Sequence, residues 1–596
     1  MNRQAMTLLF SLFLAACGQA PGNSPPGLAT QLGTFEHLPG YFDLYWDADK
    51  GRLLVEIDEL DQAFLYQSSM ARGVGSNDLG LDRGQLGATR VVRFSRSGPK
   101  VLMIEKNLDY RAQSDNADEV AAVDESFAQS VIWGFESLGE VGGKVYIDAT
   151  EFLIRDAHRI GPRLAAQGEG TYKPDASRSA IYLPNTKAFP DNSEMESIVT
   201  FTGQPTGPWL RTVTPDAETF SVHLHHSFIR LPDDNYEPLP FEPRSGYFGG
   251  TFQDYATPVG DAIQVSFARR HRLEKQDPAA AVSEAVEPIV YYVDRGAPEP
   301  IRTALVEGAA WWNQAFDAAG YRNAFQVELL PEGADPMDVR YNMIQWVHRS
   351  TRGWSYGGGV TDPRTGEIIK GKVTLGSLRV RQDYLIAEGL LAPYGDEERP
   401  DIPMEMALAR IRQLSAHEVG HTLGIQHNMA ASTQNRASVM DYPHPLIQIN
   451  EDGSISLDEA YGVGIGEWDK RVIMYGYQDF PDDIDPQAGR DAIMAETIAQ
   501  GYVYVSDPDS RSISSAHPLG NLWDNGEDAI AELEHLLNVR AIALRQFSEA
   551  NIRPGRPMAT IEEVLVPIYL IHRFQLIATG KFVGGHYFNY NLRGDG

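Results

Sequence analysis

The sequence predicts a multidomain α+β protein in which three regions follow one another. Short apolar runs broken by Gly, Asn, Asp and Pro fill residues 35–280, which indicates a β-rich N-terminal region. Strand-like and helix-like segments alternate over residues 286–480, and apolar residues recur at helical spacing over residues 485–596. At 596 residues the chain is long enough for several domains that each bury a core. We therefore expect an α/β domain between a β-rich region and a helical one.

The charge and the cysteine content exclude several functions. The formal net charge is −30, which would repel a polyanion, so no nucleic-acid partner is expected. Cys17 is the single cysteine, so the chain can form neither an internal disulfide nor a thiolate zinc cluster.

The first 34 residues have the features of a lipoprotein signal and a tether. Residues 1–17 contain one early arginine, an apolar run too short to span a bilayer and then small residues, as in a secretory signal. The Leu-Ala-Ala-Cys run that ends at Cys17 resembles a bacterial lipobox, whose cysteine becomes the lipidated first residue. The alternative is an ordinary signal with a chance cysteine. Residues 18–34 predict a flexible tether. We expect a lipid-anchored protein of the bacterial cell envelope, and Gly18 resembles outer-membrane sorting.

Each region has its own predicted elements. The clearest N-terminal strand candidates are residues 41–46, 52–57, 90–94, 101–105 and 221–230. A linker rich in Ala and Glu, residues 277–287, leads into the middle region. That region predicts a strand at 288–293, a helix at 298–320, strands at 325–330 and 340–347, a hairpin over 359–375, and helices at 378–391 and 404–423. The last region predicts helices at 491–499, 527–549 and 560–578, and charged residues exclude a membrane span there.

Three histidines on one predicted strand leave two interpretations open. His223 and His225 share a face of the strand by alternation, and His226 follows them. A second metal site would need further ligands that the sequence does not place, so surface or cross-strand packing is favoured.

A histidine motif at residues 417–427, HEVGHTLGIQH, carries the chemistry. His417 and His421 are four residues apart, so a helix presents both imidazoles on one face to one metal ion. Gly424 should end the helix, because glycine readily adopts the left-handed conformation that turns the chain back. His427 can then approach the same ion from another direction. Three ligands leave the fourth position of a zinc ion open for water, as in catalytic rather than structural zinc sites.

Glu418 has the position of a general base. Zinc lowers the pKa of its bound water to about 7 and polarises a carbonyl, and a carboxylate beside the ion can pass the water proton to the leaving amine. The alternative is that these histidines bind no metal, in which case the spacing of the motif would have arisen by chance. The predicted activity is therefore hydrolysis of peptide bonds in a peptide or protein substrate, with Zn²⁺ as the cofactor.

The motif resembles that of the metzincin clan of zinc endopeptidases, HExxHxxGxxH, at every fixed position. The clan also has a tight turn with a methionine below the metal, and the SVMDY run around Met440 fits it. The resemblance implies that Met440 packs under the imidazoles. It also implies that Tyr442 touches zinc or the transition-state oxyanion, as in astacin-like and serralysin-like members. Asn428, after the third histidine, differs from the best-known branches and leaves the subfamily open.

The resemblance covers about residues 286–480 and implies a metzincin-like catalytic domain with a mixed twisted sheet and an active-site helix. Residues 311–320 look like the first long metzincin helix, and residues 465–477 look like the helix behind the methionine turn. The whole layout is similar to a bacterial lipoprotein family of zinc-dependent metalloproteases with uncharacterised flanking domains. Members of that family usually continue further, which leaves open whether this chain is a truncated version.

Two classes of function fit these observations. The first is a zinc-dependent endopeptidase of the bacterial cell envelope, held at the membrane by a lipid on Cys17. The second is a non-catalytic envelope binding lipoprotein that keeps the metzincin fold. Glu418 favours the enzyme, because a zinc fold without activity does not need a base. A narrower rival is hydrolysis of another amide, such as a peptidoglycan crosslink, because substrate preference depends on cleft walls that the sequence does not reveal.

Overall fold

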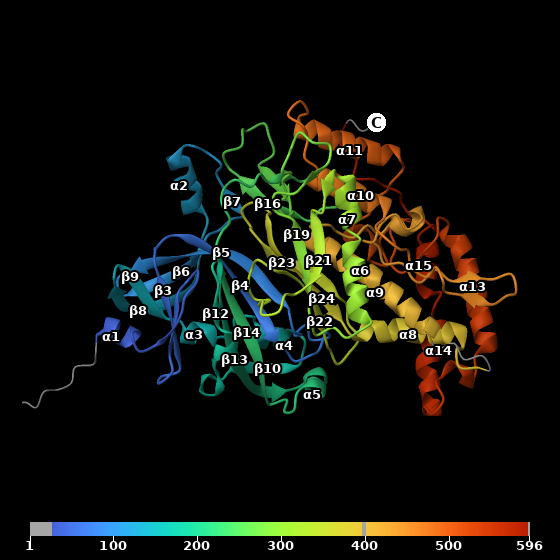
Figure 1. The fold of residues 1–596 in the computed structure, drawn as a ribbon, viewed down its shortest axis with the longest axis horizontal. Helices are drawn as coiled ribbons and strands as arrows, with labels where there is room; N and C mark the ends of the chain where they lie inside the picture. The colour runs from blue at the N-terminus through green and yellow to red at the C-terminus, as the bar shows by residue number, and fades with distance from the viewer. Residues whose placement is uncertain (1–26, 396–400, 594–596) are drawn as a thin grey trace, which may run out of the picture.

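The computed structural model describes residues 27–395 and 401–593. The signal and the lipobox cysteine Cys17 lie outside these residues. Figure 1 shows the blue N-terminal sheet at one end of the molecule, the orange and red C-terminal helices at the other, and a smaller sheet between them. The predicted β-rich N-terminal region and helical C-terminal region are confirmed. Within the described ranges, no helix has both the length and the apolar character to cross a membrane.

The N-terminal region is built on one antiparallel sheet of 13 strands. In spatial order its main path is β1 (Glu36–Leu38), β2 (Leu44–Asp47), β3 (Arg52–Ile57), β9 (Lys144–Asp148), β8 (Ser130–Val141), β6 (Lys100–Glu105), β5 (Leu86–Ser97), β4 (Ala63–Arg72), β14 (Thr219–Ile229), β13 (Asn192–Pro205) and β10 (Gly170–Pro174). Two short strands, β11 (Ala180–Ile181) and β12 (Lys187–Ala188), pair with β13. Aromatic side chains fill the core, and the rings of Phe64 and Phe228 pack edge to face with centroids 5.1 Å apart.

Short helices interrupt this region where the sequence predicts only strands and turns. They are α2 (Ala117–Ser126), α3 (Thr150–Leu153), α4 (Ile160–Ala166) and α5 (Trp209–Val213), and a further short helix, α1 (Leu28–Leu32), lies in the stretch that the sequence predicts to be a flexible tether. Asn116 caps α2 by accepting a hydrogen bond from the Asp118 amide at 3.1 Å. A small sheet follows, in the order β15 (Leu239–Pro240), β17 (Gln264–Ala268), β16 (Gly249–Asp254) and β7 (Tyr110–Arg111).

The central sheet has five strands, and four of them run parallel. Its order is β21 (Phe325–Leu329), β19 (Ile289–Val293), β22 (Asn342–Val347), β24 (Ile368–Gly376) and β23 (Tyr356–Thr361). The edge strand β23 is antiparallel to β24, as the predicted hairpin requires. The mixed sheet of the predicted α/β domain is therefore present.

Helices α6 (Ile301–Ala310), α7 (Asn313–Ala318) and α9 (Asp401–Thr422) pack with the central sheet in one core. Helices α6 and α9 cross closely at Gly308, where an added Cβ would lie 2.0 Å from the carbonyl oxygen of Arg412. Trp312 joins the same helices, because its indole Nε1 donates to the Ala416 carbonyl at 2.7 Å. The single helix predicted over residues 298–320 is divided at Trp311 and Trp312, between α6 and α7.

One of the remaining helices packs directly on α9, and the others pack mainly on neighbouring helices. The remaining helices are α8 (Leu378–Leu391), α10 (Glu467–Tyr477), α11 (Pro486–Ala499), α12 (Asp507–Ser510), α13 (Ala529–Gln546), α14 (Ile561–Tyr569) and α15 (Arg573–Gly580). Helix α8 keeps its predicted bounds, whereas the helix predicted over residues 560–578 is broken between α14 and α15. The predicted linker 277–287 contains β18 (Ser283–Glu284), which pairs with β20 (Tyr321–Arg322) of the central region.

Polar contacts join the N-terminal region to the central sheet. Arg349 Nε donates to Asp82 Oδ2 at 2.7 Å, and both side chains are 2% exposed. The Asn192 side chain donates to the Met337 carbonyl at 3.0 Å and accepts from the Val339 amide at 3.1 Å. A buried ion pair and the two hydrogen bonds of the Asn192 side chain thus hold the N-terminal region against the central sheet.

Candidate metal centre

Helix α9 presents His417, Glu418 and His421 from its last two turns, and all but His421 are fully buried. The helix ends at Thr422, and Gly424 has a φ of +96°, the left-handed conformation that the sequence predicts. An added Cβ at Gly424 would lie 1.9 Å from the carbonyl oxygen of Arg269, so a side chain does not fit there. The chain therefore turns back and brings His427 toward the helix.

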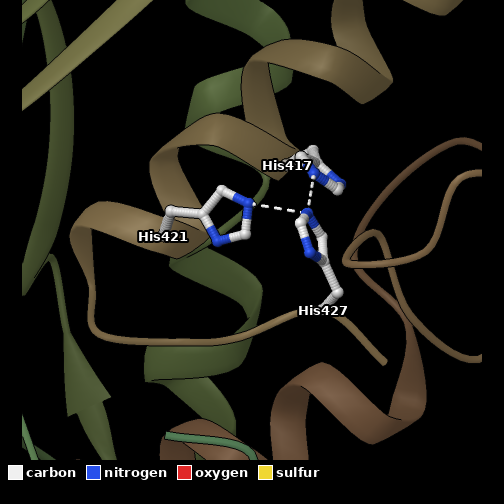
Figure 2. Close-up of side chains that lie close together, drawn as sticks. All are labelled: His417, His421 and His427. Carbon is white, nitrogen blue, oxygen red and sulfur yellow. Dashed lines mark hydrogen bonds between the residues drawn. The ribbon is translucent and has the colours of Figure 1, made fainter. Parts of the chain in front are cut away.

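The three histidines meet at one point. The Nε2 atoms of His421 and His427 are 3.0 Å apart, and those of His427 and His417 are 3.2 Å apart. Figure 2 shows His417 and His421 projecting from the helix toward His427 on the following loop. Nitrogens bound to one tetrahedral zinc ion are about 3.3 Å apart, so this spacing fits a zinc ion. No other group of three or more His, Cys, Asp or Glu ligand atoms in the described ranges is this compact.

The far nitrogen of each imidazole has its own acceptor. His417 Nδ1 lies 2.8 Å from the Val439 carbonyl, and His421 Nδ1 lies 2.8 Å from the Ile425 carbonyl. His427 Nδ1 lies 2.5 Å from Asp507 Oδ2. Acceptors at these positions favour the tautomer that carries its proton on Nδ1, which leaves every Nε2 lone pair facing the centre.

Burial keeps two of these imidazoles neutral. It lowers the pKa of His421 to about 3 and places the pKa of His417 well below its ordinary value, and the neighbouring histidines add to both shifts. Metal ions bind the neutral imidazole. The donor set therefore fits a zinc ion without any thiolate.

Glu418 is buried beside the three histidines and is 1% exposed. No group among the described residues completes a hydrogen bond to either of its carboxylate oxygens. Burial raises the pKa of this carboxyl to about 8, although the charge of Arg410 and the amide of Gly357 partly offset the effect. Buried carboxylates normally have partners, so the arrangement leaves both oxygens available to a water molecule or a substrate.

Met440 packs against the same helix. Its side chain is fully buried, and an added Cβ at Gly420 would lie 2.3 Å from Met440 Sδ and 2.7 Å from the Trp312 ring. Asp469 of α10 holds the turn by accepting from the Ser438 hydroxyl at 2.5 Å and the Val439 amide at 2.8 Å. The turn therefore fixes the Val439 carbonyl, which is the acceptor for His417.

Tyr442 also faces the centre. Its hydroxyl lies 3.2 Å from His427 Nε2, and its ring centroid lies 4.4 Å from that of His417. Burial raises the pKa of this phenol, so it stays protonated and can donate a hydrogen bond. Arg511 lies over the Tyr442 ring, with its guanidinium carbon 5.5 Å from the ring centroid.

Two stretches of the chain are similar to known protein families. Residues 399–596 match a family model described as Met-zincin. The chain carries a metzincin-type domain. Residues 84–276 match a second model, a domain of unknown function (DUF5117). No curated protein and no solved structure matches the chain.

The Met-zincin match begins before α9 and includes all three histidines, Glu418, the Met440 turn and the helices that follow. Asp507 and Arg511 also lie within it, beyond the boundary at which the sequence predicts that the catalytic domain ends. No local pattern around Asp507 points to His427, because the two residues are 80 positions apart and meet only through folding. This acceptor of the metzincin-type site is therefore absent from the residues that the sequence predicts.

The other predicted site residues lie elsewhere. Cys17 lies outside the described residues. The histidines of β14 are paired across strands: His223 bonds Glu196 at 2.5 Å, His225 bonds Glu194, and His226 bonds the Tyr66 hydroxyl at 3.0 Å. They are thus engaged in packing within the N-terminal sheet.

Proposed function

We propose that the chain is a zinc-dependent endopeptidase that hydrolyses peptide bonds with Glu418 as its general base. One observation carries the proposal: a buried carboxylate that completes no hydrogen bond within the described ranges lies beside three imidazoles whose Nε2 atoms converge at zinc spacing. A structural zinc site would close its fourth position with another ligand. Such a site would also gain nothing from a buried carboxyl, which costs free energy when it is unpaired.

The residues have the following roles in this proposal. His417, His421 and His427 hold the ion, which when bound acidifies water and polarises the scissile carbonyl. Glu418 accepts the proton of the attacking water and delivers it to the leaving amine. The carboxylate must be ionised for this, and the positive charge held by the three imidazoles favours that form. The Tyr442 hydroxyl donates a hydrogen bond to the oxyanion that develops on the carbonyl.

We also propose a location and a class of substrate for this enzyme. A lipid on Cys17 would tether the enzyme to a membrane of the bacterial cell envelope, and peptides or proteins of that compartment would be its substrates. Cys17→Ser should release the protein from the membrane fraction or block processing of the signal. Unchanged attachment of this variant to membranes would contradict the anchoring.

The decisive experiment separates chemistry from binding. Glu418→Gln keeps the shape of the side chain but cannot accept a proton, and loss of a general base typically costs about 10² to 10⁴ in rate. The purified parent should cleave a mixed peptide library, lose activity with a chelator and regain it with zinc. The variant should fold, hold one zinc and cleave almost nothing. If the parent cleaves no peptide, a binding lipoprotein or hydrolysis of another amide becomes the better explanation.

A further inference from the structure

A cavity of about 370 Å³ lies between the N-terminal sheet and the central sheet, and none of its lining residues belongs to the histidine centre. Strands β4, β13 and β14 form one wall, and strands β22, β23 and β24 form the other. The volume is in the range of sites that bind small molecules. The cavity therefore has the size of a ligand site at a domain junction.

The lining carries an excess of positive charge in a chain whose net charge is −30. The lysines and arginines are Arg83, Lys187, Lys370 and Lys372, and the carboxylates are Glu194, Glu196 and Asp335. The carboxylates already have partners, because Lys187 pairs with Asp335, and His225 lies between the two glutamates. Lys370 and Lys372 thus form no ion pair with these carboxylates, although the charge of Glu194 still acts on both lysines.

Two residues apart on β24, Lys370 and Lys372 lie on the same face of the central sheet. Lys370 Nζ donates to the carbonyls of Pro336 and Asp338 at 2.7 and 2.9 Å. Lys372 Nζ makes no hydrogen bond or ion pair with any residue of the described ranges. Burial lowers the pKa of both ammonium groups to about 8, and for Lys372 the charge of Lys370 adds to the effect. A bound anion would offset the free-energy cost of keeping these two ammonium groups charged.

Two further polar groups beside Lys372 lack partners. Gln345 Oε1 and Thr374 Oγ1 are buried without a hydrogen bond in the described part of the chain. Both converge with Lys372 on Gly84, where an added Cβ would lie 3.4 Å from Thr374 Oγ1, 3.5 Å from Gln345 Oε1 and 3.7 Å from Lys372 Cε. Buried polar groups are nearly always hydrogen-bonded in native proteins. An amide and a hydroxyl can both turn to donate to an anion.

The lining also contains uncharged polar residues, among them Gln67, Ser69, Asn185 and Ser227, and a set of apolar ones, Met70, Leu86, Ile229, Met337, Val339, Met343 and Val360. We propose that this cavity binds a small organic carboxylate, with its anionic end at Lys372 and Lys370 and its apolar part among the methionine and valine side chains. Lysine acts on a carboxylate as a point charge, and flexible methionines adapt to the shape of an apolar ligand.

The first test uses the full chain and a probe of this chemistry. Isothermal titration calorimetry with isocaproate should give saturable binding. Isocaproamide has the same shape but no charge, and inorganic phosphate has the charge but no apolar part, so each should bind at least about tenfold more weakly. Absence of saturable isocaproate binding, or equal binding of either comparator, would overturn the proposal. A carboxylate can also bind a zinc ion at the histidine centre, so a variant of the cavity must show which site the isocaproate occupies.

The second test uses a variant that should leave the fold intact. Lys372→Gln removes a destabilising charge from a side chain without hydrogen bonds, so its Tm without ligand should not fall below that of the parent, while isocaproate binding weakens at least about tenfold. Lys173→Gln on β10 removes an exposed lysine outside the cavity and is the matched control, for which binding should not change. Parental isocaproate affinity in Lys372→Gln would refute the site.

Discussion

Asp507 Oδ2 lies 2.5 Å from Nδ1 of His427, so a carboxylate from the C-terminal helices holds the last histidine of a motif 80 residues earlier. A carboxylate at this nitrogen fixes the orientation of the ring and increases its basicity toward a metal ion. His417 and His421 have backbone carbonyls in the same position. The charged acceptor thus serves the one histidine that lies outside the helix.

Asp507→Asn should weaken zinc binding by about 10- to 100-fold, because the amide lacks the charge that polarises the His427 ring. The measurement is zinc retention against a graded series of chelator concentrations, with folding checked by circular dichroism. Asp482→Asn is the control, because Asp482 is exposed and distant in sequence from the site. Asp507 also pairs with Arg511 at 2.5 Å, so Arg511→Met should be measured in parallel. Parental zinc affinity in Asp507→Asn would contradict the role of this carboxylate.

Gly420→Ala should destabilise the protein by about 1 to 3 kcal/mol, because its methyl group would collide with Met440 Sδ and the Trp312 ring. Displacement of Met440 should also loosen the zinc site that it underlies. The free energy of unfolding in urea and the zinc content report the two effects. Gly580→Ala in α15 is the matched helical control, because an added Cβ there meets nothing within 4 Å. A Gly420→Ala protein as stable as the parent would show that Met440 can move without cost.

Tyr442→Phe should reduce kcat by about 10²-fold with a smaller change in KM, because the hydroxyl acts on charge that develops only in the transition state. Zinc should be retained, since the ring still packs against His417 and His427. Steady-state kinetics on a peptide cleaved by the parent, together with metal analysis, checks both parts. An unchanged kcat would show that Tyr442 only lines the site and does not stabilise the transition state.

Stability should depend on pH through His225. Burial alone would lower the pKa of this imidazole, but hydrogen bonds with Glu194 and Glu196 outweigh burial and raise it to about 9. The unfolded value is about 6.5. The stabilisation is therefore fully present below about pH 6.5 and is lost as the pH rises through about 9.

The measurement is the urea midpoint of His225→Gln and the parent over this pH range. The variant should be less stable by a few kcal/mol at about pH 6, and the difference should shrink toward pH 9 and above. His586→Gln, which changes an exposed histidine, should show no such trend. A difference between His225→Gln and the parent that is constant with pH would contradict the charged pairing.

Local signals in the sequence predict the centre of the site but not its surroundings. The i, i+4 spacing of His417 and His421 and the glycine at position 424 act over a few residues, so α9 and its end follow directly from them. Asp507 reaches His427 only after α12 has packed against the site, and short-range patterns do not contain that step. Asp469 could be placed only on the helix behind the turn, without its hydrogen bonds to Ser438 and Val439.

Contacts between residues far apart in the sequence also accompany the points where the predicted fold differs from the structure. The predicted helix 298–320 has continuous helical spacing, yet the Trp312 indole bonds to α9 and the helix divides beside it. In the N-terminal sheet the individual strands could be predicted, but β4 pairs with both β5 and the distant β14. Alternation specifies which face of a strand is buried, and it does not specify which strand lies beside it.

The buried pair of Arg349 and Asp82 limits how this protein could be activated. If a protease removed the N-terminal region, Arg349 would stay in the central region without its counter-charge, and loss of one partner of a buried pair typically costs about 3 to 5 kcal/mol. Cleavage would also open the lysine-lined cavity to solvent. We therefore expect the N-terminal region to remain part of the folded protein, unlike a propeptide that is cut away to release activity.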